Sequence, residues 1–145
     1  MAEQEGPDHF RLTIITPERT VFDGPVTVLT VSAPQGVLQI FPRHEALLSP
    51  LAVHNIAFMQ PNQPKETQAA VLGGFLEVAG AGVTVLADVA ELGADVDAQR
   101  AQEAKDRAEA RLRGQKAGEK VDVDRAQAAL LRSIARIRAA EAKPI

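Results

Sequence analysis

The chain lacks cysteine, tryptophan and tyrosine, and each absence narrows what the protein can be. Without cysteine it forms neither a disulfide nor a thiolate metal site, and it is compatible with a reducing compartment. Its only aromatic residues are 5 phenylalanines, so the core must be largely aliphatic. No apolar run approaches the roughly 18 residues that a membrane-spanning helix needs, and no leader segment is recognised.

Residue patterns that support common enzyme chemistry are also missing. The three histidines, at positions 9, 44 and 54, have no metal-ligand spacing, and no glycine-rich loop ends in Lys-Ser or Lys-Thr. No serine follows the nucleophile-elbow pattern. The Gly73-Gly74 pair lies between predicted strands, which favours close backbone packing over phosphate binding. We therefore expect no catalytic residues, no metal site and no required cofactor.

Charge and proline divide the chain into two parts. Residues 1–94 carry 4 basic and 10 acidic residues, whereas residues 95–145 carry 12 and 9, and eight of the nine prolines lie in the first part. The first part contains short alternating apolar segments between turn signals, which is typical of an antiparallel β-sandwich or barrel. The predicted strands are Phe10–Thr16, Thr20–Phe22, Val26–Val31, Val37–Phe41, Ala52–Met59, Thr67–Leu72, Phe75–Val78 and Val83–Ala87.

The second part repeats itself and is rich in helix-forming residues. A shift of 25 residues matches ten of eighteen positions, including Asp97 with Asp122. An Ala- and Arg-rich composition inflates such agreement, so two helices with related faces are an alternative to duplication. Each aspartate is expected to cap a helix, with Gly114 just past the first one. We predict an α+β protein: a β-sandwich or barrel domain at 1–94 and an antiparallel two-helix hairpin at 95–145.

The predicted seam between the two helices is thin, because alanine dominates one side. Its members are Ala101, Ala104, Ala108 and Leu112 on the first helix and Ala126, Leu130, Ile134 and Ile137 on the second. At roughly 25 cal/mol per Å² of apolar surface, such a seam contributes only a few kcal/mol. The hairpin is therefore expected to open without great cost.

Arginines form a ridge on each predicted helix. The two trios are Arg100, Arg107 and Arg111, and Arg125, Arg132 and Arg136, each within about 40° of one helix face. Approximate twofold symmetry of the hairpin would place Arg100 near Arg132 and Arg136, and Arg111 near Arg125. One interpretation is two solvated faces with intrahelical ion pairs. The other is an anion site, because clustered guanidiniums are stabilised by a shared phosphate or carboxylate.

Six short motifs occur in order along the chain. They are Leu12-Thr13-Ile14-Ile15-Thr16-Pro17-Glu18, Val21-Phe22-Asp23-Gly24, Ile40-Phe41-Pro42-Arg43-His44, Gly73-Gly74-Phe75-Leu76-Glu77-Val78, Val83-Thr84-Val85-Leu86-Ala87-Asp88, and Asp97 with Arg100-Ala101. Together, over residues 10 to about 140, they resemble the epsilon subunit of rotary ATP synthases. The chain departs from the family pattern at Val37, Gln39 and Arg43, so we expect its c-ring contacts to differ.

The resemblance implies a non-catalytic subunit of the central stalk that couples the rotor to the catalytic head. The sandwich would bind the gamma subunit and the c-ring. The hairpin would permit turnover when folded on the sandwich. When extended along gamma it would reach the acidic loop of a beta subunit and inhibit ATP hydrolysis. The subunit would then lie at the cytoplasmic face of the bacterial plasma membrane, peripheral and held there only through the complex.

The resemblance also implies a regulatory ligand. Some family members bind ATP on the folded hairpin through Ile or Leu, Asp, two residues, Arg and Ala, which stands here as Val96-Asp97-Ala98-Gln99-Arg100-Ala101. By the same match Glu91 precedes the pattern, and Arg132 and Arg136 supply further phosphate contacts. Partner contacts are expected from Phe41, Arg43 and His44 on the sandwich and from Arg107, Arg111, Arg113 and Arg125 on the hairpin.

A second interpretation is a free-standing adaptor whose basic hairpin binds an acidic protein. Nucleic acid is a poor candidate partner for either interpretation, because the chain has net charge −3 and lacks aromatic residues on which bases could stack. Co-purification with gamma would separate the two interpretations.

Overall fold

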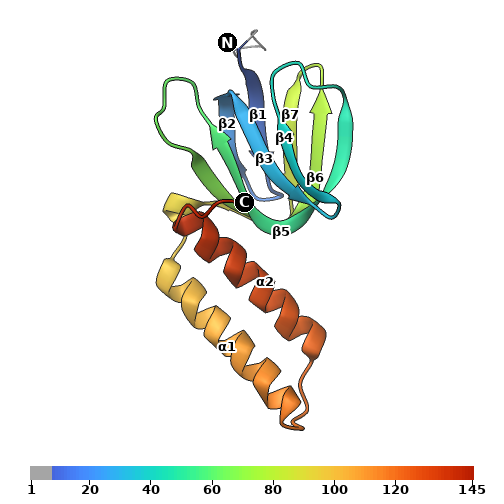
Figure 1. Ribbon diagram of the computed structural model, residues 1–145, viewed down its shortest axis with the longest axis vertical. Coiled ribbons are helices and arrows are strands. Elements are labelled where there is room, and N and C mark those ends of the chain that lie inside the picture. The colour runs from blue at the N-terminus through green and yellow to red at the C-terminus, as the bar shows by residue number, and fades with distance from the viewer. Residues whose placement is uncertain (1–7) are drawn as a thin grey trace.

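The structure is a computed structural model that describes residues 8–145. Figure 1 shows a β-sandwich from which two helices project side by side. The elements are β1 Phe10–Ile15, β2 Thr20–Val26, β3 Val28–Ala33, β4 Gly36–Ile40, β5 Leu47–Met59, β6 Thr67–Ala79, β7 Gly82–Ala87, β8 Ala90–Leu92, the 3-10 turn η1 Gly93–Asp95, α1 Ala98–Lys116 and α2 Val123–Ala140. The predicted fold class, a sandwich followed by a helical hairpin, is confirmed.

The strands form one hydrogen-bonded sheet that folds over on itself. Its order is β2-β1-β7-β6-β5-β3-β4, with β8 paired to β6. All pairs are antiparallel except β1 with β7, which run parallel. The long strands β5 and β6 take part in both layers: Leu47–Leu51 pairs with Gly74–Val78 in one layer, and Val53–Phe58 pairs with Thr67–Leu72 in the other. The fold is thus antiparallel with a single parallel exception.

Two glycines let β6 cross from one layer to the other. Gly73 has φ 91° and Gly74 φ 135°, values that side-chain-bearing residues rarely adopt. A Cβ at Gly74 would also collide with the carbonyl oxygen of Leu86 on β7. The predicted role of this pair in close backbone packing is confirmed, and the two strands predicted around it are the halves of one bent strand.

The core lies between the layers and consists of aliphatic side chains with two phenylalanines, Phe10 and Phe58, as expected. Every member of this core lies between Phe10 and Ala90. The hairpin therefore adds nothing to the main core, and the sandwich has its own.

Strand β2 is longer than predicted, because Asp23-Gly24-Pro25 was expected to end it at Phe22. The structure instead carries the strand on to Val26. Strand β2 is at the edge of the sheet and pairs only with β1. Proline has no N–H to donate, and an edge strand tolerates this. Asp23 is held by Arg11 on β1, whose Nη2 lies 2.6 Å from a carboxylate oxygen.

Both helices begin where the sequence predicts. The side chain of Asp97 accepts a hydrogen bond from the backbone N–H of Arg100, and that of Asp122 accepts one from Arg125. The predicted end of the first helix at Gly114 is wrong, since α1 continues to Lys116. The glycine that ends the helix is Gly118, with φ 89°, which follows the C-cap and suits the left-handed turn found there.

The predicted alanine seam between the helices is confirmed for three of its residues. Ala101 and Ala108 on α1 and Ala126 on α2 are almost fully buried. A second apolar face of α2 was not predicted: Ala135 and Ala139 pack against Ala70 and Leu72 of β6. It was missed because alanines in an Ala-rich helix give no periodic contrast. Helix α2 therefore packs on α1 along one face and on the sandwich along another.

Candidate functional site

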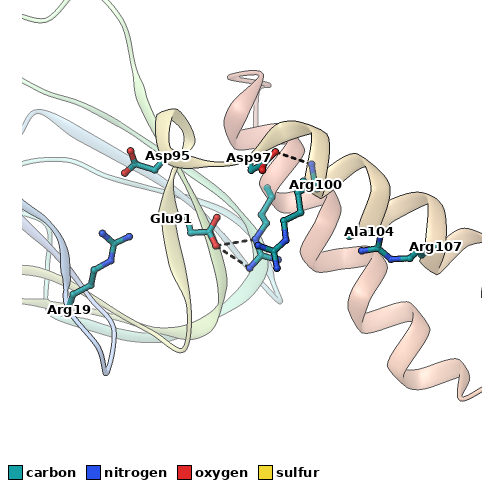
Figure 2. Close-up of a pocket in the computed structure, with 9 residues that line it drawn as sticks. Arg19, Glu91, Asp95, Asp97, Arg100, Ala104 and Arg107 are labelled. Carbon is teal, nitrogen blue, oxygen red and sulfur yellow. Dashed lines mark hydrogen bonds and ion pairs between the residues drawn. The ribbon is translucent and has the colours of Figure 1, made fainter.

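A cavity of about 610 Å³ opens where the hairpin meets the sandwich. It is lined by Arg19, Glu91, Asp95, Asp97, Arg100, Ala101, Ala104, Arg107 and Arg136. Figure 2 shows Arg19 at the sandwich end and Arg107 at the hairpin end, with Glu91 and Arg100 between them. The site thus combines the β1–β2 turn, β8, η1 and both helices.

The central contact of the cavity is an ion pair between the two domains. Arg136 on α2 donates from Nη2 and Nε to one oxygen of Glu91 on β8, at 3.1 and 3.3 Å. Both side chains are about 30% exposed, at 29% and 30%. The pair exists only while α2 lies against the sandwich, so it marks the docked state of the hairpin.

The remaining charges leave the cavity able to accept an anion. Four guanidiniums and three carboxylates line it, an excess of one positive charge. Asp97 is engaged as the cap of α1, and Glu91 is paired with Arg136. Within residues 8–145, neither Arg19, Arg100 nor Arg107 forms an ion pair. Three guanidiniums are therefore available to phosphate oxygens, which match their forked donors.

The turn that carries Arg19 is held rigidly. The hydroxyl of the mostly buried Thr16 donates to the carbonyl of Arg19 at 3.1 Å and accepts from its N–H at 3.2 Å. The backbone N–H of Thr16 adds a third hydrogen bond, to the same carbonyl, at 2.9 Å. This fixes the backbone from which the Arg19 side chain enters the cavity.

Most of the predicted ligand residues meet in this cavity. Glu91, Asp97, Arg100, Ala101 and Arg136 all line it. Val96 is not among the lining residues, and Arg132 is exposed outside them. Arg107, predicted as a partner contact, lines the cavity together with Arg100. The sequence did not predict that Arg19, Asp95 and Ala104 line this cavity. Nothing in the sequence could place Arg19 there, because its turn is distant from the hairpin along the chain.

A smaller cavity of about 340 Å³ lies at the far end of the hairpin. Arg111 from α1 and Arg125 from α2 both line it, together with Lys120 and Asp122. The symmetry argument had placed these two arginines together. Arg113, also predicted as a partner contact, is exposed on α1 and lines neither cavity.

The predicted contacts on the sandwich lie in the loop after β4. Phe41 is 53% exposed, although large apolar side chains are usually buried. Arg43 has a positive φ of 63°, and the N–H of His44 donates to the carbonyl of Phe41 at 3.2 Å, which closes a tight turn. The loop therefore presents Phe41 from a fixed backbone.

An exposed apolar patch on one outer face of the sandwich was not predicted. It consists of Leu48, Phe75 and Leu86, which are 68%, 51% and 46% exposed on β5, β6 and β7. Phe75 and Leu86 are register partners, so their side chains share a face. The register partner of Leu48 is Glu77, which alternates with Phe75 and so lies on the same face. Large apolar side chains exposed together on one face are typical of a protein-binding surface. The alternation of apolar residues could have indicated this patch, because Leu48, Phe75 and Leu86 each lie next to buried residues along their strands.

Neither described helix is long and apolar enough to cross a membrane.

Comparisons with known proteins cover almost the whole chain. The family model "ATP synthase, Delta/Epsilon chain, beta-sandwich domain" matches residues 9–93, and "ATP synthase, Delta/Epsilon chain, long alpha-helix domain" matches residues 94–141. The ATP synthase epsilon chain of Alkalihalophilus pseudofirmus is 42% identical over 106 residues, which cover 73% of this chain and 78% of the relative. That of Symbiobacterium thermophilum is 46% identical over 107 residues, covering 73% and 76%.

One solved structure has the same fold over nearly its full length. It is a chain of the Euglena gracilis mitochondrial ATP synthase, determined by cryo-EM with OSCP, F1 and c-ring in rotational state 1. The TM-score is 0.76 at 19% identity, and the match covers 97% of this chain and 90% of that one.

Proposed function

This chain belongs to the ATP synthase delta/epsilon family as an epsilon subunit, and we propose that it is a non-catalytic part of the central stalk whose hairpin inhibits ATP hydrolysis and senses ATP. Family membership favours this interpretation over a free-standing adaptor. The observation that carries the sensing role is the arginine-lined cavity, which is complete only while the hairpin is docked on the sandwich.

In this proposal ATP binds the docked hairpin as a regulatory ligand. Its phosphates contact Arg100, Arg107 and Arg136, with Arg107 in the place that we had expected Arg132 to take. Glu91 and Asp97 lie toward the ribose and adenine. Since residues of both domains line the cavity, a bound anion stabilises the docked state over any state in which the helices have separated from the sandwich.

In this proposal the hairpin itself inhibits ATP hydrolysis. Residues 95–145 carry three more basic than acidic residues, a charge suited to the acidic loop of a beta subunit. The seam between the helices and the contact of α2 with the sandwich rest mostly on alanines, so docking is weak enough to reverse. Arg111, Arg113 and Arg125 are exposed and would face beta after extension.

The sandwich supplies the permanent contacts in this proposal. The patch of Leu48, Phe75 and Leu86 is the surface for gamma, because apolar area of this kind gains most from burial by a partner. Phe41, Arg43 and His44 lie in one loop and contact the c-ring. Through these partners the subunit is held at the cytoplasmic face of the bacterial plasma membrane.

Isothermal titration of the full-length subunit with ATP tests the sensing role. Arg100→Ala and Arg136→Ala should each weaken binding by about 1.5 to 3 kcal/mol, the usual range for hydrogen bonds to charged groups. Arg113→Ala is the matched control, because it removes an exposed arginine from the same hairpin without touching the cavity. No heat at millimolar ATP, or equal losses in Arg100→Ala and Arg113→Ala, would rule the site out.

A further inference from the structure

The chain does not continue outward after α2 but turns back onto the sandwich. Ala142 has a positive φ of 53°. The N–H of Ala142 donates to the carbonyl of Ala139 at 3.3 Å, and that of Lys143 to the carbonyl of Arg138 at 2.9 Å. Figure 1 shows the C-terminus beside β5, at the end of the sandwich that faces the helices. We call residues 141–145 the C-terminal tail.

Two side-chain amides of the sandwich form hydrogen bonds with the backbone of this tail. Asn55 Nδ2 on β5 and Gln68 Nε2 on β6 both donate to the carbonyl oxygen of Lys143, at 3.1 and 3.0 Å. Asn55 Nδ2 uses its second hydrogen to bind Gln68 Oε1 at 2.7 Å. Asn55 is 0% and Gln68 5% exposed. Buried amides need partners, and the tail provides one that both amides share.

Arg138 joins α2 to the same network. Its Nε donates to Asn55 Oδ1 at 3.2 Å, and its Nη2 donates to the carbonyl of Pro144. The arginine thus binds the sandwich and the tail at once. Throughout residues 8–145, no buried side-chain nitrogen or oxygen is left without a hydrogen-bond partner, so this network is fully satisfied.

The apolar part of the same docking surface is small by comparison. Ala135 and Ala139 pack on Ala70 and Leu72, with Val53 at the margin, and alanine side chains bury little area. Docking of α2 therefore depends strongly on the polar network. Without the tail, the nearly buried Asn55 and Gln68 lose a shared acceptor, and α2 loses the two hydrogen bonds by which the tail ties it to the sandwich.

We propose that the C-terminal tail is a latch whose receptor is Asn55 and Gln68, and that its seating sets how often the hairpin leaves the sandwich. The latch acts on docking itself, so it operates whether or not ATP binds. Loss of the last five residues, or their capture by another molecule, releases the hairpin without any change in the nucleotide cavity.

A single cysteine can report release, because the natural chain contains none. The thiol of Leu72→Cys lies beneath α2 and reacts with a soluble disulfide reagent only after the hairpin lifts. In the otherwise full-length chain, removal of residues 141–145 should speed this reaction about tenfold or more, because two or three hydrogen bonds to buried groups are lost. A second reporter, Val85→Cys, lies in the sandwich core and should keep its rate.

Two further variants separate a latch from general destabilisation. Lys143→Ala should change nothing, since the receptor binds only the backbone carbonyl of that residue. Gln68→Met removes the donor to Lys143 and also the acceptor of Asn55, so it should speed Leu72→Cys labelling strongly in the full chain but much less once the tail is deleted. An unchanged rate after tail deletion overturns the proposal, as does an equal rise at both reporters or a Gln68→Met effect that is as large without the tail as with it.

Discussion

Arg19 is the residue whose placement most extends the predicted site. It adds a guanidinium from the sandwich to a cavity whose other guanidiniums belong to the hairpin, and without it the lining charges would balance. A polyanion such as ATP is attracted more strongly to a cavity whose lining carries an excess of positive charge.

We therefore predict that Arg19→Ala weakens ATP binding about fivefold, because the cavity loses its one excess positive charge. Titration calorimetry at two salt concentrations measures it, and the loss should shrink at high salt. Arg43→Ala removes another sandwich arginine away from the cavity and should bind ATP normally. Equal affinities of Arg19→Ala and the natural chain would show that Arg19 only borders the site.

Asp23 gives a pH-dependent prediction. The hydrogen bond from Arg11 lowers the pKa of the Asp23 carboxyl from its usual range. A carboxylate with a lowered pKa stabilises the folded state above its unfolded pKa, near 4, and this stabilisation is lost as pH falls through the folded pKa.

Asp23→Asn should accordingly lower Tm by only about a degree or two at neutral pH, because the pair is well exposed. The difference from the natural chain should stay constant down to about pH 5 and shrink below about pH 4. Thermal melts across that range measure it. A difference that grows on acidification would contradict the sign.

At the scale of elements, α2 approaches the backbone of η1 closely at Gly93. A Cβ at Gly93 would collide with the carbonyl oxygen of Ala139. Gly93 itself does not need a left-handed backbone, and the added Cβ would lie 3.3 Å from the carbonyl oxygen of Gln68 on β6, so alanine there strains mainly the docking of α2 and only slightly the sandwich.

Gly93→Ala should thus undock the hairpin, reduce ATP affinity at least tenfold and leave the melting of the sandwich nearly unchanged. Hydrogen exchange of α1 and α2, together with calorimetry, measures both effects. Gly80→Ala is the matched control, because nothing lies within 4 Å of its added Cβ. If both variants keep full ATP affinity, close approach at Gly93 is not required for docking.

On the scale of the whole molecule, we predict that the sandwich folds independently of the hairpin. The main core draws only on residues of the sandwich, whereas the hairpin depends on alanine contacts and a polar network. We expect residues 1–94 to fold alone and to bind gamma, which circular dichroism and pull-down can check. Loss of gamma binding by this fragment would contradict the division into two domains.

Deletion of residues 95–145 from the assembled ATP synthase should raise ATP hydrolysis while the complex stays intact. The reason is that the proposed brake is removed, but the apolar patch and the loop of Phe41 are not. Hydrolysis by purified complexes with and without the hairpin is the measurement. Equal rates in intact complexes would count against inhibition.

The sequence by itself determined most of what depends on local pattern, although the ends of β2 and α1 differ from the prediction. Alternation predicted most of the strands, Asp97 and Asp122 predicted the helix starts, and the family pattern at Asp97, Arg100 and Ala101 predicted three of the nine residues that line the cavity. These features need only neighbouring residues, because capping and pleating are set within a few positions along the chain.

Only the tertiary structure decided which surfaces meet. It joined Glu91 to Arg136, brought Arg19 to the hairpin, left Arg132 outside the cavity and seated the carbonyl of Lys143 on Asn55 and Gln68. These partners lie far apart in the chain. They are selected by how α2 is rotated on the sheet, which depends on alanines that carry no periodic signal and on the backbone fit at Gly93.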